Sequence, residues 1–119
     1  MKLFAMTLLI GIFGLLLAGG FGGQDPLQVN PTIYNKKLEN NRVRVFMVVF
    51  KPGQSIAVHK HPDHVVHAVQ GGKIQINEVG KKSVTMDVPT GATVFLPAQS
   101  HSAKNLSKHT MRLLVVELK

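Results

Sequence analysis

Four of the six histidines in this 119-residue chain lie in one short segment, between Gly53 and Gly72. They are His59, His61, His64 and His67. Neutral imidazole is the commonest protein metal ligand, and two residues at i and i+2 of a strand point to the same face. The pair His59 and His61 can therefore aim at one point, and a residue from a neighbouring strand can complete a metal site. A fifth histidine, His101, follows a second segment marked by turn residues.

The first residues are predicted to be a cleavable signal peptide. Met1 and Lys2 form a short positive start, residues 3–18 are almost wholly apolar, and small residues follow as far as Gly23. This order is typical of a secretory signal, and the apolar run is shorter than the roughly 20 residues that span a bilayer. We therefore expect residues 1–23 to be removed, with no stable membrane span after cleavage. The mature protein is expected to be periplasmic or secreted.

Composition limits the partners of the mature chain. The formal net charge is +8, but the basic residues are scattered singly or in pairs, and the chain has one tyrosine and no tryptophan. Nucleic-acid grooves need clustered basic residues or stacking aromatics, so we expect no nucleic-acid partner. A small-molecule or anionic ligand remains compatible with this charge. Without any cysteine, a domain of just under a hundred residues has no disulfide to stabilise it, which favours a homodimer.

The rest of the chain has the pattern of an all-β domain. Short runs of β-branched and aromatic residues are separated by turn residues, at 42–50, 55–59, 65–69, 73–77, 83–88, 92–96 and 111–117. The turn at Gly80 and Lys81 predicts a hairpin between the strands on either side. Residues 24–41 are expected to form an N-terminal extended arm or edge strand, and residues 42–119 a β-barrel.

Two spaced motifs in this sequence resemble those of the cupin superfamily. The first opens as Gly53, five residues, His59, one residue and His61. The second contains Gly91, five residues and Pro97, then His101, three residues and Asn105.

The likeness covers residues 53–105, with two departures from the family pattern. Where the first motif has a glutamate, this chain has Val65 or His64, depending on which glycine closes the motif. In the second motif one residue is missing between Pro97 and His101, and Gln99 replaces a glycine.

The resemblance implies a small antiparallel jelly-roll (cupin) β-barrel with a divalent metal inside it. His59, His61 and His101 match ligand positions of the family, and His64 is expected to be the fourth ligand, with His67 as the alternative. Nitrogen ligands suit zinc, iron, copper or nickel more than calcium or magnesium. Asp63 is expected to orient a ligand imidazole through a hydrogen bond.

The sequence leaves three functions open. The metal could support chemistry on a small organic substrate, with little help from carboxylates, because the chain has only six. The alternative is a non-catalytic module that binds a metal or a small ligand. A metal-free barrel that serves as a dimeric interaction protein is the third. Fold resemblance does not choose between these functions.

Overall fold

The computed structural model describes residues 24–119, so the predicted signal peptide lies outside the described residues. The described chain contains one short helix, α2 (Pro26–Val29), and nine strands. The strands are β1 (Tyr34–Glu39), β2 (Val43–Phe50), β3 (Ser55–His61), β4 (His64–Gln70), β5 (Gly72–Glu78), β6 (Val84–Val88), β7 (Thr93–Leu96), β8 (Gln99–Asn105) and β9 (Met111–Leu118). Between residues 24 and 119, no helix is long and apolar enough to cross a membrane.

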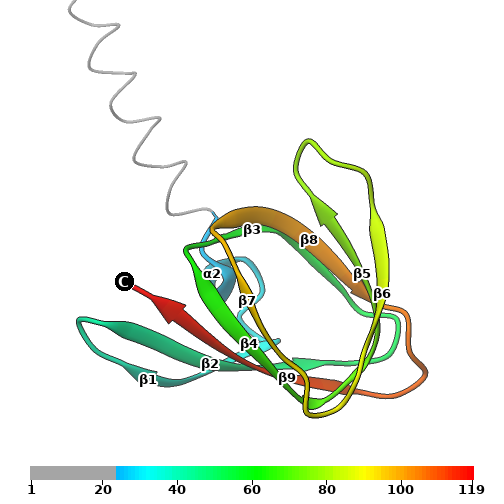
Figure 1. Cartoon of the computed structure of the whole chain (residues 1–119), viewed down its shortest axis with the longest axis horizontal. Coiled ribbons are helices and arrows are strands. Elements are labelled where there is room, and N and C mark those ends of the chain that lie inside the picture. Colours follow the sequence, from blue (N-terminus) through cyan, green and yellow to red (C-terminus); the bar gives the residue numbers. More distant parts are fainter. Residues whose placement is uncertain (1–23) are drawn as a thin grey trace, which may run out of the picture.

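The nine strands form two antiparallel sheets that curve around a common interior (Figure 1). One sheet has the order β1-β2-β9-β4-β7, and the other has the order β3-β8-β5-β6. The all-β antiparallel prediction is confirmed. The expected closed barrel is not formed, because in the described residues strand pairing stays within each sheet. The two sheets therefore leave unpaired edges, and two of these, β6 and β7, are consecutive in the chain.

Most strands lie where residue alternation predicted them, and the Gly80–Lys81 hairpin joins β5 to β6. The strand that residue alternation did not predict is β8, because its sequence Gln-Ser-His-Ser-Ala-Lys-Asn carries few strand-forming residues. Pairing with β3 on one side and β5 on the other makes this segment a strand. At the N-terminus, β1 is an edge strand that pairs with β2, whereas helix α2 was not expected.

The core between the sheets is built by one face of β2. Phe46, Val48 and Phe50 are almost completely buried, and they alternate with residues that face outward. Burial of side chains of this size stabilises a fold by ~1.5–3 kcal/mol each. On β9, Met111 and Val115 continue the same buried layer. This layer forms the floor against which the histidine-bearing strands pack.

The motif glycines have two different structural roles. Gly53 and Gly91 lie in turns with φ angles of +72° and +89°, a region that favours glycine. Gly72 instead lies within β5, where a Cβ atom would come within 2.3 Å of Ser107 Oγ and 2.8 Å of Met111 Cγ. Glycine is therefore required by a turn at Gly53 and Gly91 and by close packing at Gly72.

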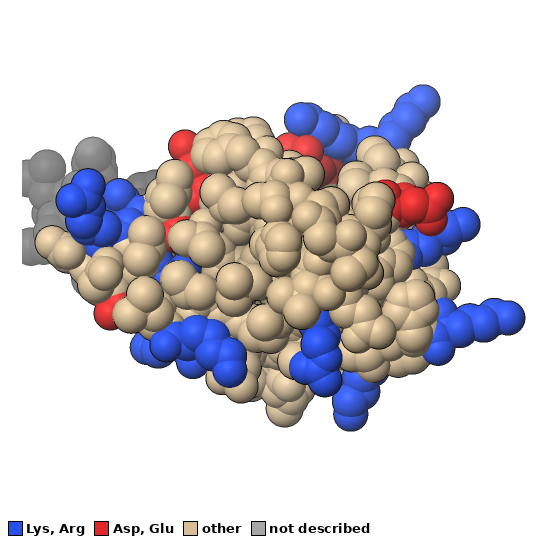
Figure 2. Space-filling view, turned by 60° about the horizontal axis from the view of Figure 1, so that its bottom comes forward, with Lys and Arg blue, Asp and Glu red and all other residues tan. Residues whose placement is uncertain are grey.

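The outer face of the five-stranded sheet carries an apolar row that crosses every strand. Register places Leu38 beside Val45, Val45 beside Val116, Val116 beside Val65, and Val65 beside Phe95. Leu38 and Phe95, at the two ends, are 52% and 58% exposed. Figure 2, in which the lower side of Figure 1 is turned forward, shows a broad surface with few charges at its centre and basic side chains around it. Antiparallel sheets usually present polar residues on an outer face, so this row is unusual.

Candidate metal centre

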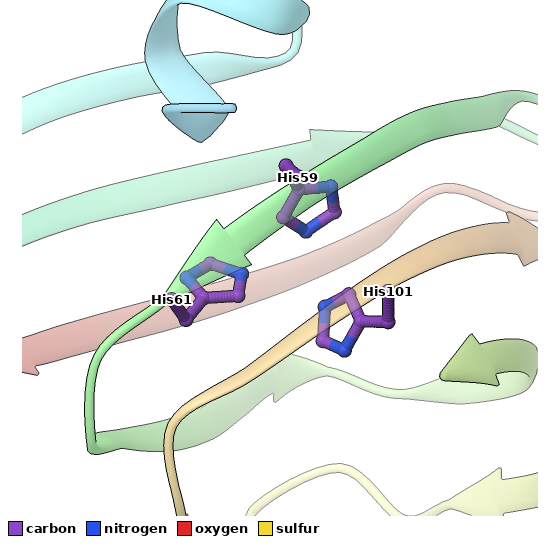
Figure 3. A group of neighbouring side chains, drawn as sticks. All are labelled: His59, His61 and His101. Carbon is purple, nitrogen blue, oxygen red and sulfur yellow. The ribbon is translucent and has the colours of Figure 1, made fainter. Parts of the chain in front are cut away.

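Strand register brings the two histidine motifs together. His59 and His61 lie on the inner face of β3, and His101 of β8 is the direct cross-strand partner of His59. All three are buried, with exposures of 7% or less. Figure 3 shows the three rings gathered on neighbouring strands, with their nitrogens turned toward a shared space. The antiparallel pairing of β3 with β8 is what converts two distant motifs into one site.

The distances between the three rings fit a shared ligand site. The ring centroid of His101 lies 4.6 Å from that of His59 and 5.1 Å from that of His61, and the two β3 rings are 4.7 Å apart. One nitrogen from each residue lies within 4.8 Å of the other two. The predicted convergence of His59, His61 and His101 is confirmed. Metal–nitrogen bonds are about 2 Å long, so small side-chain adjustments suffice to enclose an ion.

Each imidazole in this region has its Nδ1 atom next to an oxygen acceptor. The acceptor is Ala57 O for His59 (2.8 Å), Glu117 Oε2 for His61 (2.7 Å), Pro62 O for His64 (2.8 Å) and Gln99 Oε1 for His101 (2.7 Å). Carbonyl and carboxylate oxygens only accept, so Nδ1 must carry the proton in each ring. A neutral ring then has its lone pair on Nε2. Four imidazoles are thus held in the tautomer that can bind a metal through Nε2.

Burial lowers the pKa of three of these imidazoles, those of His59, His64 and His101. Desolvation is the main reason that the pKa of His59 is lowered to about 4 and that of His101 to about 3. The neighbouring histidines lower the pKa of His101 further, because each would repel a second positive charge. The pKa of His64 is also lowered, first by burial and then by His61. Neutral imidazole is the form that ligates metals, so these three residues are ready for a cation at neutral pH.

The two alternatives for a fourth ligand lie on opposite faces of β4. His64 is buried at the inner face, and its ring is stacked on that of His61 with centroids 4.4 Å apart. It lies outside the group of three nitrogens that are within 4.8 Å of one another. His67 faces outward, where its Nδ1 lies 2.7 Å from Thr93 Oγ1. Side-chain alternation along the strand therefore leaves His64 beside the site and His67 away from it.

The carboxylate that contacts a histidine of the site is Glu117, which the sequence reasoning missed. Its Oε2 accepts the Nδ1–H of His61, and the Glu117 side chain is only 3% exposed. The expected role of Asp63 is wrong, because its carboxylate accepts the backbone N–H of Ala98 at 2.8 Å. Glu117 is 56 residues from His61 in the chain, and its proximity depends on the pairing of β9 with β4. No local sequence signal distinguished it.

The replacement of a motif glycine by Gln99 has a structural consequence. Gln99, which replaces a glycine, accepts the Nδ1–H of His101, and its amide nitrogen lies 3.3 Å from Pro97 O. The donor contact with Pro97 turns the amide oxygen toward His101.

Asn105, at the end of the motif, is fully buried and donates to the carbonyl oxygens of Phe50 and His109. Asn105 therefore stabilises the loop after β8, and its hydrogen bonds do not go to the histidines of the metal site.

The histidines line a cavity of about 350 Å³ between the sheets. Most of its wall is aliphatic or aromatic, with residues such as Val48, Phe50, Ile74, Ile76 and Leu113. Val84 and Met86 of β6 and Val94 of β7 also line it and are 44–51% exposed, so the entrance lies at these two edge strands.

Glu78 is the single acidic residue among the described residues that line the cavity. It is the cross-strand neighbour of His101. Its side chain is 33% exposed and lies 3.2 Å from Lys81 Nζ.

The comparisons with known proteins agree with this architecture. The family described as cupin domain matches residues 46–117, and the chain therefore belongs to the cupin domain family. A crystal structure of a cupin domain from Bordetella pertussis is similar, with a TM-score of 0.68 and 28% identity over 73% of this chain and 92% of that one. No match is found among curated protein sequences.

Two further solved structures share the fold at lower identity. An uncharacterized protein with a double-stranded β-helix domain from Klebsiella pneumoniae has a TM-score of 0.60 and 24% identity, over 72% of this chain and 75% of that one. A cupin family protein from Methanocaldococcus jannaschii has a TM-score of 0.58 and 15% identity, over 72% and 78%. At these identities the likeness concerns the fold and carries no statement about chemistry.

Proposed function

We propose that this cupin binds a divalent metal through Nε2 of His59, His61 and His101, with His64 available as a fourth ligand. The observation that carries the proposal is the set of Nδ1 hydrogen bonds, which leaves the Nε2 atoms of a buried cluster available as donors to a metal. Nε2 of His59 also lies 3.5 Å from the Tyr34 hydroxyl, a contact that a bound ion would replace. Nitrogen donors of this kind suit zinc, iron, copper or nickel. A bound ion with an open coordination position would supply Lewis acidity to a small organic molecule in the cavity.

The cavity supports a small organic anion with an apolar body as the ligand. Neutral imidazoles do not offset the charge of a divalent ion, which favours an anionic group on the ligand. The nearby Glu117 carboxylate forms an ion pair with Arg44 at 2.7 Å, so part of its charge is already balanced. The aliphatic wall and the entrance between β6 and β7 suit the apolar part of such a ligand. We propose that the mature protein meets this ligand outside the cytoplasm.

Catalysis and simple binding make different demands on the same cavity. In a catalytic role, Glu78 would accept or donate a proton near a ligand held beside His101. The second candidate function is a non-catalytic binding module. It is favoured by the scarcity of acid–base groups, because Glu78 is the single acidic residue among the described residues that line the cavity.

Elemental analysis and calorimetric titration test the proposal directly. After removal of metals with a chelator, the protein is expected to bind Zn²⁺ or Ni²⁺ with a stoichiometry of about one ion per chain. The His67→Ala variant is the matched control, because His67 lies on the outer face of β4 and should bind metal like the wild type. Absence of stoichiometric binding for Zn²⁺, Ni²⁺, Cu²⁺ and Fe²⁺ alike would reject the metal site.

We also propose that the apolar row on the outer face of the five-stranded sheet is buried in a homodimer. Such interfaces are richer in apolar residues than other surfaces, and a two-fold axis through the row would place it against itself. The Phe95→Lys substitution is expected to convert the dimer to a monomer, since it would bury an unpaired charge. Light scattering after size-exclusion chromatography measures this, with Val79→Lys, on an exposed turn outside the row, as the control. A monomeric wild type would contradict the proposal.

A further inference from the structure

The buried carboxylate of Glu117 has two partners of different kinds. Its Oε2 accepts the Nδ1–H of His61 at 2.7 Å. Its Oε1 accepts from the Arg44 guanidinium, at 2.9 Å from Nε and 2.7 Å from the terminal nitrogen. Arg44 also donates two hydrogen bonds to Asp25, at 2.8 and 3.1 Å. The chain of contacts therefore runs from His61 through Glu117 and Arg44 to Asp25, at the start of the described chain.

We infer that Glu117 is the positioning residue of the metal site: with Arg44, it fixes the His61 tautomer and so makes His61 a ligand. This inference rests on the proposed metal site and adds to it the group that prepares one ligand. Arg44 has donors only, so the oxygen that faces it must be an acceptor. A carboxylate has a second acceptor oxygen for the Nδ1–H of His61. The lone pair of that ring is then on Nε2, the atom that a metal needs.

The Glu117→Gln substitution distinguishes this role from simple packing, because glutamine has nearly the same shape but only one acceptor oxygen. Arg44 requires that oxygen, which turns the amide NH₂ toward Nδ1 of His61. The His61 ring must then accept at Nδ1 and carry its proton on Nε2. We expect the metal-free variant to show this reversed tautomer by ¹⁵N NMR of the imidazoles. Its affinity for Zn²⁺ is expected to fall by roughly 10–100-fold.

A second substitution, Arg44→Met, should restore the Nδ1–H tautomer of His61 that Glu117→Gln removes. In the double variant Glu117→Gln with Arg44→Met, the amide is free to turn its oxygen to His61. We expect the Nδ1–H tautomer to return and Zn²⁺ to bind more tightly than in Glu117→Gln alone. The matched control is Asp63→Asn, which also exchanges a carboxylate for an amide near the site, but whose carboxylate accepts from Ala98 N and not from Nδ1 of His61. It should leave both the tautomer and the Zn²⁺ affinity unchanged.

The outcomes separate this inference from the proposed function. If the wild type binds Zn²⁺ and Glu117→Gln binds it equally well with an unchanged His61 tautomer, the positioning role is overturned. A double variant with no recovery would also overturn it, since packing damage would then explain the loss. If the wild type binds no metal, the proposed function fails, and the NMR measurement on metal-free protein still tests how Glu117 sets the tautomer. If Glu117→Gln does not fold, Glu117→Asp, which keeps both acceptor oxygens, must preserve the Nδ1–H tautomer.

Discussion

Replacement of His59, His61 or His101 by alanine is expected to abolish stoichiometric metal binding. Each supplies one of the three nitrogens that lie within 4.8 Å of one another, and the two that remain, with His64 outside this closest group, cannot enclose a divalent ion tightly. Metal content after equilibrium dialysis against Zn²⁺ measures the effect. Circular dichroism of the metal-free variants checks that the fold is kept. Retention of one ion per chain in any of the three variants would remove that histidine from the site.

His64 and His67 serve as graded controls for the same experiment. We expect His64→Ala to weaken metal binding clearly without abolishing it, because His64 is buried against His61 but lies outside the closest group. The His67→Ala variant should bind like the wild type, because its ring contacts Thr93 on the outer face. Loss of binding on His67→Ala with full binding on His64→Ala would contradict the inner-face assignment of β4.

Acidification of the metal-free protein is expected to reduce its free energy of unfolding steeply below about pH 6.5. The pKa of His59 is lowered to about 4 and that of His101 to about 3, mainly by burial, from an ordinary value near 6.5. Between these values the unfolded chain binds protons that the folded chain does not, so stability falls as pH falls. Each such proton costs about 1.4 kcal/mol per pH unit. His64 acts in the same direction over this range, since its pKa is also lowered, whereas the contribution of Asp25 is lost only as the pH falls below its ordinary pKa of 3.8.

Urea denaturation of the metal-free protein at several pH values between about 7.5 and 4.5 measures this dependence. The control is His101→Gln, which removes one of the titrating groups and should reduce the slope by about one proton. A free energy of unfolding that stays constant over this range would show that the folded and unfolded chains bind protons equally, and would contradict the neutral, buried state of these histidines.

The fold class was predictable because strand alternation is a local property. Residues 43–50 alternate between buried and outward-facing positions, and turn residues such as Gly53 and Gly80 mark where strands end. β8 escaped prediction because its stability comes from its two neighbouring strands and not from its own residue types. The unpaired edges of the two sheets were also not predictable from the sequence, since closure of a barrel depends on how far both sheets curve.

The sequence alone determined that His59 and His61 share a face, because i and i+2 spacing on a strand leaves no other choice. Its two spaced motifs also indicated that His101 joins them. Only the tertiary structure decided which groups surround that pair. The register of β4 sends His64 inward and His67 outward, and the register of β9 carries Glu117 to His61 across 56 residues of chain. A shift of one residue in either strand would reverse the face of every side chain on it, and no local pattern records that choice.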